Sequence, residues 1–140
     1  MHFLVDDERT QYTIKLINRS RRAAVSVHVE LMIAESERTR SGLIMNRTYL
    51  SLSEPDPLVI RSRRKKDETH SWNPSAYRIR TTEDLHSLTN SENKYVRVRV
   101  HADHEVSGVG EVFEHYYHHP ESELVPGRFA RSDTFEVVPA

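Results

Sequence analysis

The stretch Val25-Ser26-Val27-His28-Val29-Glu30-Leu31-Met32-Ile33 decides the fold of this chain, because two sets of side chains alternate along it. One set is aliphatic and the other is mostly polar. Successive side chains of a β-strand point to opposite faces, so this period of two predicts a strand with one face in the core and one mostly toward water. The stretch Val96–Ala102 repeats the pattern, with Arg97, Arg99 and His101 between the small apolar residues.

Shorter apolar runs predict the remaining elements. Further strands are expected at 12–16, 43–52, 57–62, 109–117, 128–129 and 135–138. Seven or eight short strands, with turn signals every 8–15 residues, favour an all-β fold, an immunoglobulin-like antiparallel β-sandwich.

Two polar stretches between these strands predict local structure. Asn18–Arg22 is typical of a hairpin turn, because Asn and Ser side chains bond their own backbone. Thr81–Leu88 predicts one short helix with threonines as its N-cap. Leu85 and Leu88 are three residues apart on it and are expected to plug one end of the sandwich.

The composition is that of one polar but foldable domain. The chain has 140 residues, of which 36% are hydrophobic and 29% charged. This is enough for one hydrophobic core that needs no cross-links to be stable. We expect residues 1–9 to be a flexible N-terminal segment or tether and residues 10–140 to be a single sandwich domain, with a long loop at 61–75. No apolar stretch approaches the roughly 20 residues that span a bilayer. The lack of cysteine fits a cytoplasmic location, at the inner face of the membrane if the domain is tethered.

The motifs argue against catalysis. The absence of cysteine excludes disulfides, thiolate zinc sites and cysteine nucleophiles. There is no Gly-x-Ser-x-Gly nucleophile motif, and Ser107–Gly110 lacks the following glycine and the lysine of a phosphate-binding loop. None of the scattered carboxylates stands in the apolar context that a general acid or base needs. We therefore expect a non-catalytic protein without a cofactor.

Histidines provide the main alternative, a metal-binding or enzymatic domain. Five of the nine histidines fall close together in the sequence: His101, His104, His115, His118 and His119. On a helix, His115 and His119 would share one face and hold zinc or nickel. On the strand expected here, His115 and His118 face opposite sides, so exposed histidines and no metal site are the main expectation.

Two clusters of basic residues are the candidate binding site. They comprise Arg19, Arg21 and Arg22, and Arg61, Arg63, Arg64, Lys65 and Lys66. If both lie at one end of the sandwich, we expect them to bind anionic lipid headgroups or an acidic protein partner, at about 1 kcal/mol per cation near a charged leaflet. The alternative is a solvated loop that keeps the surface soluble. Nucleic acid is not expected, because the net charge is −1 and aromatic residues do not interleave with the basic ones.

Three further side chains have two interpretations each. Trp72, the single tryptophan, is expected to anchor the 61–75 loop on the core or to be an exposed contact residue. Arg97 and Arg99 are expected on a solvated sheet face, or against acidic residues of another subunit in a homo-oligomer.

Several stretches, taken in order, resemble a known family. They are Leu16–Ala23 with the alternating strand to Ile33, Leu50–Ile60, Thr82–Leu85, Val96–Ala102, Val109–Tyr117 and Glu123–Phe129. Together they resemble the cytoplasmic domain of inward-rectifier-type potassium channels, whose Trp-Gly pair is replaced here by Pro126-Gly127. The sequence has no pore loop or selectivity filter, so we expect no ion conduction by this chain. The resemblance implies a non-catalytic interaction or regulatory domain, the soluble part of a membrane-associated protein, which assembles at the cytoplasmic face and responds to lipid or ligands.

Overall fold

Eleven strands and two four-residue helices make up the computed structural model, which describes residues 4–6, 11–62, 76–91, 93–130 and 134–138. In chain order they are β1 (Leu4–Asp6), β2 (Tyr12–Ile17), β3 (Ala24–Thr39), β4 (Gly42–Leu50), β5 (Leu58–Ile60), β6 (Ala76–Thr81), α1 (Leu85–Leu88), β7 (Lys94–His104), β8 (Gly110–Tyr117), α2 (Pro120–Glu123), β9 (Val125–Pro126), β10 (Arg128–Phe129) and β11 (Val137–Val138). The prediction of an all-β fold is confirmed. Neither of the two helices in the described chain is long and apolar enough to cross a membrane.

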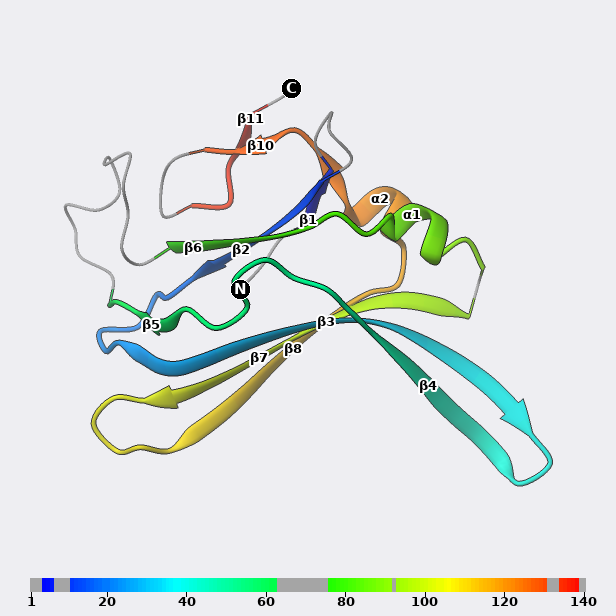
Figure 1. Ribbon diagram of the computed structural model, residues 1–140, viewed down its shortest axis with the longest axis horizontal. Helices are drawn as coiled ribbons and strands as arrows, with labels where there is room; N and C mark the ends of the chain where they lie inside the picture. The colour runs from blue at the N-terminus through cyan, green and yellow to red at the C-terminus, as the bar shows by residue number, and fades with distance from the viewer. Residues whose placement is uncertain (1–3, 7–10, 63–75, 92, 131–133, 139–140) are drawn as a thin grey trace.

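The strands form two facing sheets (Figure 1). The large sheet has the order β4-β3-β7-β8, and β5 pairs with the first part of β3. The small sheet has the order β6-β2-β1-β9, and only its β1–β9 pairing is parallel. The two-stranded ribbon of β10 and β11 covers the small sheet on the side away from the large one (Figure 1).

The core lies between the two sheets and uses the alternation of the sequence. It comprises Tyr12, Ile14, Leu16, Val27, Val29, Leu31, Ile33, Ile60, Ile79, Leu85, Val96, Val98, Val100, Tyr117 and Leu124. Burial of one aliphatic side chain of this size stabilises a fold by roughly 1.5–3 kcal/mol. This apolar layer therefore holds the sheets together and leaves their outer faces for polar side chains.

The predicted core face of β3 holds from Val27 to Ile33, but two parts of the alternation are wrong: Met32, expected mostly toward water, is fully buried, and the faces are exchanged at Val25. Ser26 has a positive φ of 51°, and the pairing of β3 with both β5 and β7 shifts its register there. Such a bulge inserts one extra residue and exchanges the two faces of the strand before it. As a result Ala24, rather than Val25, packs against the core.

The hairpin turn predicted at residues 18–22 is also wrong, although its local chemistry is as expected. The Ser20 amide donates to Asn18 Oδ1 at 3.0 Å, and the Arg22 amide donates to Ser20 Oγ at 3.1 Å. However, β2 and β3 belong to different sheets and do not pair. The segment is an arch that carries the chain from one layer to the other.

The predicted helix at one end of the sandwich is confirmed as α1, but with a different cap. Asp84 is the N-cap, and its Oδ1 accepts a hydrogen bond from the Ser87 amide at 3.2 Å, whereas Thr81 ends β6. Leu85 is fully buried in the core, while Leu88 is 37% exposed and does not plug the end. The second helix, α2, was not expected.

Strands β1, β6 and β9, all in the small sheet, have no counterpart among the predicted elements. Residues 4–6, expected within the flexible segment 1–9, pair with β2 and β9. Strands β1 and β9, with three and two residues, are too short to show a periodic pattern, whereas β6 has six residues but few apolar ones. The predicted loop 61–75 lies largely outside the described residues, since only 61–62 are described, and this also applies to Trp72.

Candidate functional site

The first arginine cluster, Arg19, Arg21 and Arg22, lies on the arch between β2 and β3. We call this end of the sandwich the open end, because a cavity opens there between the two sheets. Asn18 organises the arch by donating from Nδ2 to the carbonyls of Arg22, at 2.9 Å, and Ile60, at 3.0 Å. With its backbone fixed in this way, the arch exposes the side chains of Arg19, Arg21 and Arg22. None of the three has an ion-pair partner among the described residues, and Arg19 lies over the ring of Phe135 at 5.6 Å.

The second cluster begins beside the first. The hydrogen bond from Asn18 to the Ile60 carbonyl places the end of β5 against the arch, and the exposed Arg61 follows directly. The structure thus brings together four of the eight predicted binding residues. The other four, Arg63, Arg64, Lys65 and Lys66, lie outside the described residues.

A cavity of about 320 Å³ opens between the two sheets next to the arginine arch. Apolar side chains of both sheets and of the loop before β8 line it: Leu16, Ile17, Val27, Ile60, Val100, Val109 and Phe113. The polar lining comes from two sides of the mouth, with Arg19 on the arch and Asp103 and Glu111 on β7 and β8. An apolar interior with a few charged groups at its mouth is typical of a site for an amphiphilic ligand.

Exposed apolar side chains lie at the same end of the molecule, and two of them, Val109 and Phe113, also line the cavity. Val106 and Val109, in the loop between β7 and β8, are 65% and 60% exposed. Phe113 shares the core-facing side of β8 with Tyr117 but is 45% exposed, because it lies at the cavity. Figure 1 places the β7–β8 loop and the β2–β3 arch at the same end of the molecule. Sequence reasoning missed this apolar rim, since no pattern in the chain tells where the small sheet stops covering the large one.

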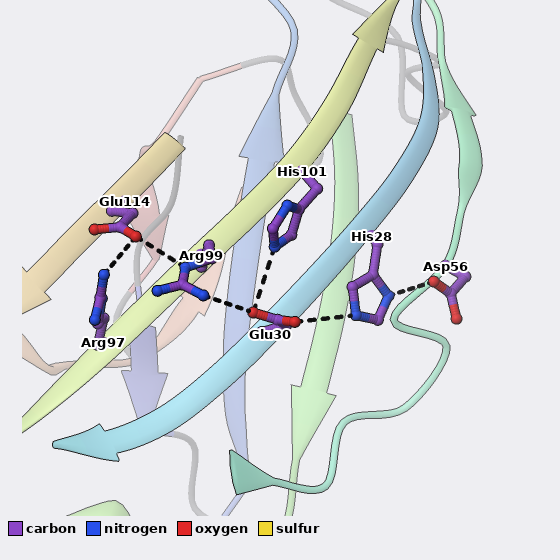
Figure 2. Close-up of polar contacts among 7 residues, drawn as sticks. All are labelled: His28, Glu30, Asp56, Arg97, Arg99, His101 and Glu114. Carbon is purple, nitrogen blue, oxygen red and sulfur yellow. Dashed lines mark hydrogen bonds and ion pairs between the residues drawn. The ribbon is translucent and has the colours of Figure 1, made fainter. Parts of the chain in front are cut away.

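The outer face of the large sheet has a second polar cluster, a chain of acidic and basic side chains in contact across β3, β7 and β8 (Figure 2). Glu114 accepts from Arg97 and from Arg99 Nε, the latter at 2.8 Å. Glu30 lies 3.5 Å from Arg99 and 3.4 Å from His101. His28 continues the chain from Glu30 to Asp56, which comes from the segment before β5 (Figure 2).

These contacts decide the role of Arg97 and Arg99. Both were expected on a solvated face or at a subunit interface, and instead their acidic partners, Glu30 and Glu114, come from the same chain. Arg97 is only 7% exposed and stacks on the ring of Tyr116 at 5.1 Å. The cluster ties three strands together and leaves no free cation to a ligand at this position.

Glu114 is the most strongly perturbed acid of the cluster. Its hydrogen bond with Arg97, and then that with Tyr116, lower the pKa of the Glu114 carboxyl from 4.5 to about 2. The same contacts raise the pKa of the Arg97 guanidinium and of the Tyr116 hydroxyl. Both arginines therefore face a carboxylate that stays ionised far into the acid range.

We expect Glu114→Gln to destabilise the protein by about 1–2 kcal/mol at neutral pH, less than the full pKa shift implies because a quarter of the side chain is exposed. A carboxyl whose pKa is lowered by folding stabilises the fold above its unfolded value and loses this contribution as the pH falls. The wild-type protein should therefore lose this stability between about pH 4.5 and pH 2, and the variant should lose correspondingly less. Urea unfolding over this range measures the effect. Glu111→Gln, on the same strand and without an ion pair among the described residues, is the control, and an equal pH dependence in both variants would contradict the assignment.

The described histidines of the 101–119 region contact different neighbours instead of one another. His115 packs against Tyr117 with ring centres 4.4 Å apart, whereas His118 stacks on Tyr116 and contacts Tyr95. This separation of His115 and His118 onto opposite faces confirms the expectation from the strand pattern. Partial burial lowers the pKa of the His115 imidazole. Within the described residues, no three histidine, aspartate or glutamate side chains are grouped so that they could hold a metal ion.

Comparison with known proteins adds no family to this geometry, because neither a protein-family model nor a curated protein sequence matches the chain. The functional argument therefore depends on the two features of the open end, its arginines and its apolar cavity.

Proposed function

We propose that this chain is a non-catalytic interaction or regulatory domain and that it contacts an anionic membrane surface through the open end of the sandwich. The observation that carries the proposal is the gathering of Arg19, Arg21, Arg22 and Arg61 beside the exposed side chains of the β7–β8 loop. Cations and apolar side chains on the same surface are what a lipid interface of headgroups and acyl chains binds.

The arginines supply the electrostatic part of the proposed contact. Near an anionic leaflet each cation contributes about 1 kcal/mol, so the three arginines of the arch together account for about a hundredfold in affinity. Because the arginines are exposed, this attraction is screened by salt. The Asn18 hydrogen bonds hold the arch in place, so little backbone ordering is needed on contact.

The apolar rim supplies the second part. Val106 and Val109 are already exposed, and their transfer into the interface removes apolar surface from water at roughly 25 cal/mol per Å². The cavity behind them, with Val100 and Phe113 in its lining, has room for part of an acyl chain. The acidic side chains at the mouth, Asp103 and Glu111, favour an approach in which the arginine arch faces the headgroups.

The resemblance to the cytoplasmic domain of inward-rectifier-type potassium channels belongs to the same proposal. It would make the chain the non-spanning part of a membrane-associated protein, located at the cytoplasmic face. The metal-binding alternative has no comparable support, because His115 and His118 face opposite sides of the sheet.

Vesicle sedimentation tests the proposal. We expect binding to vesicles that contain phosphatidylserine, weaker binding at high salt, and none to phosphatidylcholine alone. Changing Arg19, Arg21 and Arg22 together to glutamine should weaken binding about a hundredfold. Changing Val106 and Val109 to serine should weaken it at every salt concentration, since the apolar part is not screened.

The control is a second triple variant with the same change in net charge. Arg40, Arg80 and Arg128 are exposed arginines on other parts of the molecule, and changing them to glutamine should leave binding within about twofold. Equal binding to neutral and anionic vesicles, or equal losses in the two triple variants, would refute the proposal.

A further inference from the structure

The hairpin of β3 and β4 extends beyond the sandwich as an arm (Figure 1). Residues Gly42 to Tyr49 are all exposed, and only Leu50, the last residue of β4, is partly buried. They include four large apolar residues, of which Leu43 is 68% and Tyr49 58% exposed, together with Ile44 and Met45. Neither sheet of the same molecule covers this surface.

Strand β4 is also an open edge of the large sheet. Among the described residues it pairs only with β3, so every second backbone N–H and C=O of β4 points outward. Natural edge strands are blocked by charges or proline. The opposite edge, β8, carries Glu111 and Glu114, whereas β4 has no proline and a single charge, Arg47.

We propose that two copies of this chain pair through β4, antiparallel and about a two-fold axis at Asn46. The two large sheets then join into one continuous sheet, with β4 of each copy at its centre. An isologous contact of this kind closes on itself, so the product is a dimer and not a fibre. The proposal is independent of the membrane contact, which lies at the other end of the molecule (Figure 1).

The sequence of β4 is self-complementary in this register. The pairing with β3 puts Leu43, Met45, Arg47 and Tyr49 on one face of the strand. With the axis at Asn46, Leu43 of each copy lies opposite Tyr49 of the other, and Met45 lies opposite Arg47. Aromatic–aliphatic cross-strand pairs are among the favourable ones in antiparallel sheets.

Neighbouring registers are less favourable. With the axis at Arg47 the two guanidinium groups would lie directly opposite each other, and like charges in that position are destabilising. With the axis at Met45, Leu43 would lie opposite Arg47 and Tyr49 would have no partner within β4. The Asn46 axis keeps the two Arg47 side chains on a diagonal and uses the whole strand. This fit of the strand to itself is what favours a second copy over an unrelated strand as the occupant.

Because the chain contains no cysteine, single introduced thiols can test the register. Asn46→Cys places its two thiols at the axis, where diamide as oxidant should convert them to an intermolecular disulfide in most of the protein. In Thr48→Cys the two thiols are offset by four residues, or about 13 Å, too far for a disulfide. Ile44→Cys alone has the same offset. A mixture of Ile44→Cys and Thr48→Cys should nevertheless yield the mixed dimer, because these positions lie opposite each other.

Light scattering on the unmodified protein supplies the second readout. We expect a monomer near 1 μM and a dimer near 200 μM, since pairing of one strand per copy gives a small interface that dissociates on dilution. Ile44→Lys together with Tyr49→Lys should abolish the dimer and leave the unfolding midpoint of the monomer unchanged, because both positions are on the arm. A monomer at every concentration, or equal cross-linking at positions 44, 46 and 48, would overturn the proposal.

Discussion

Gly127→Ala is expected to destabilise the protein by about 3 kcal/mol or more and to detach β11 from β10. Gly127, between β9 and β10, has a φ of 135°, a conformation that residues with a Cβ rarely adopt. An alanine Cβ there would also lie 2.6 Å from the Val138 carbonyl oxygen and 2.7 Å from Val137 Cγ1. Since the closest atom belongs to the backbone of β11, rotation of a side chain cannot relieve the contact. Urea unfolding measures the loss of stability.

Gly42→Ala is the matched control for this prediction. Its φ of 131° is almost the same as that of Gly127, but a Cβ at Gly42 would have no atom within 4 Å. This substitution therefore carries the backbone strain without the clash, and we expect a loss of only about 1–2 kcal/mol. Equal losses in the two variants, measured at a protein concentration low enough to keep the chain monomeric, would show that β11 does not lie against Gly127.

The sequence pattern predicts the large sheet much better than the small one. Strands β3 and β7 have one face in the core and a second face that is mostly polar, and each is long enough for the alternation to be recognised. The small sheet is covered on both sides, by the core and by the ribbon of β10 and β11. Its central strand, β2, buries Lys15 on the face where a charge would ordinarily indicate solvent. Burial on the outer face of such a strand depends on a segment that is distant in the sequence, so it cannot be predicted from the residues of the strand alone.

The arch at residues 18–22 shows a second limit of local reasoning. Its Asn and Ser side chains bond the backbone in the same way in a hairpin and in an arch between sheets. What separates the two is whether β2 and β3 pair, and this depends on β6 and β1, which take the two sides of β2. Strand β6 has few apolar residues: Ile79 is buried in the core and Tyr77 packs against it, with arginines at the other central positions.

The candidate site was predictable to a similar extent. The arginines of the arch are recognised from composition alone, and Arg61 could be placed beside them only by the hydrogen bond from Asn18 to Ile60. The cavity could not be predicted without knowing the relative position of the two sheets. The pairing of Arg97 and Arg99 with Glu114 needs the register of β7 and β8, which period-two patterns leave open by steps of two residues.

Like Gly127, Lys15 makes a large contribution to stability that the sequence pattern does not predict. Its side chain is fully buried beneath the ribbon, and its Nζ donates to the carbonyls of Ala130, at 3.1 Å, and Thr134, at 2.5 Å. The same ammonium lies 5.5 Å from the centre of the Phe129 ring. A buried cation needs such partners, because an unpaired charge in the interior is strongly destabilising. Lys15 thereby attaches the C-terminal ribbon to the small sheet.

We expect Lys15→Ala to lower the unfolding free energy by about 3–4 kcal/mol, because the carbonyls of Ala130 and Thr134 lose a charged donor and a cavity remains. Lys15→Met keeps most of the aliphatic stem without the ammonium, so it should recover about half of this loss and separate packing from hydrogen bonding. The ribbon should respond first: the Ala130 amide, which donates to the Glu136 carbonyl at 2.8 Å, should exchange its hydrogen faster in Lys15→Ala than in the wild type. Thr13→Ala, on the same face of β2, is the control. A Lys15→Ala protein within about 0.5 kcal/mol of the wild type in urea unfolding, with unchanged exchange at Ala130, would show that the ribbon is held by other contacts.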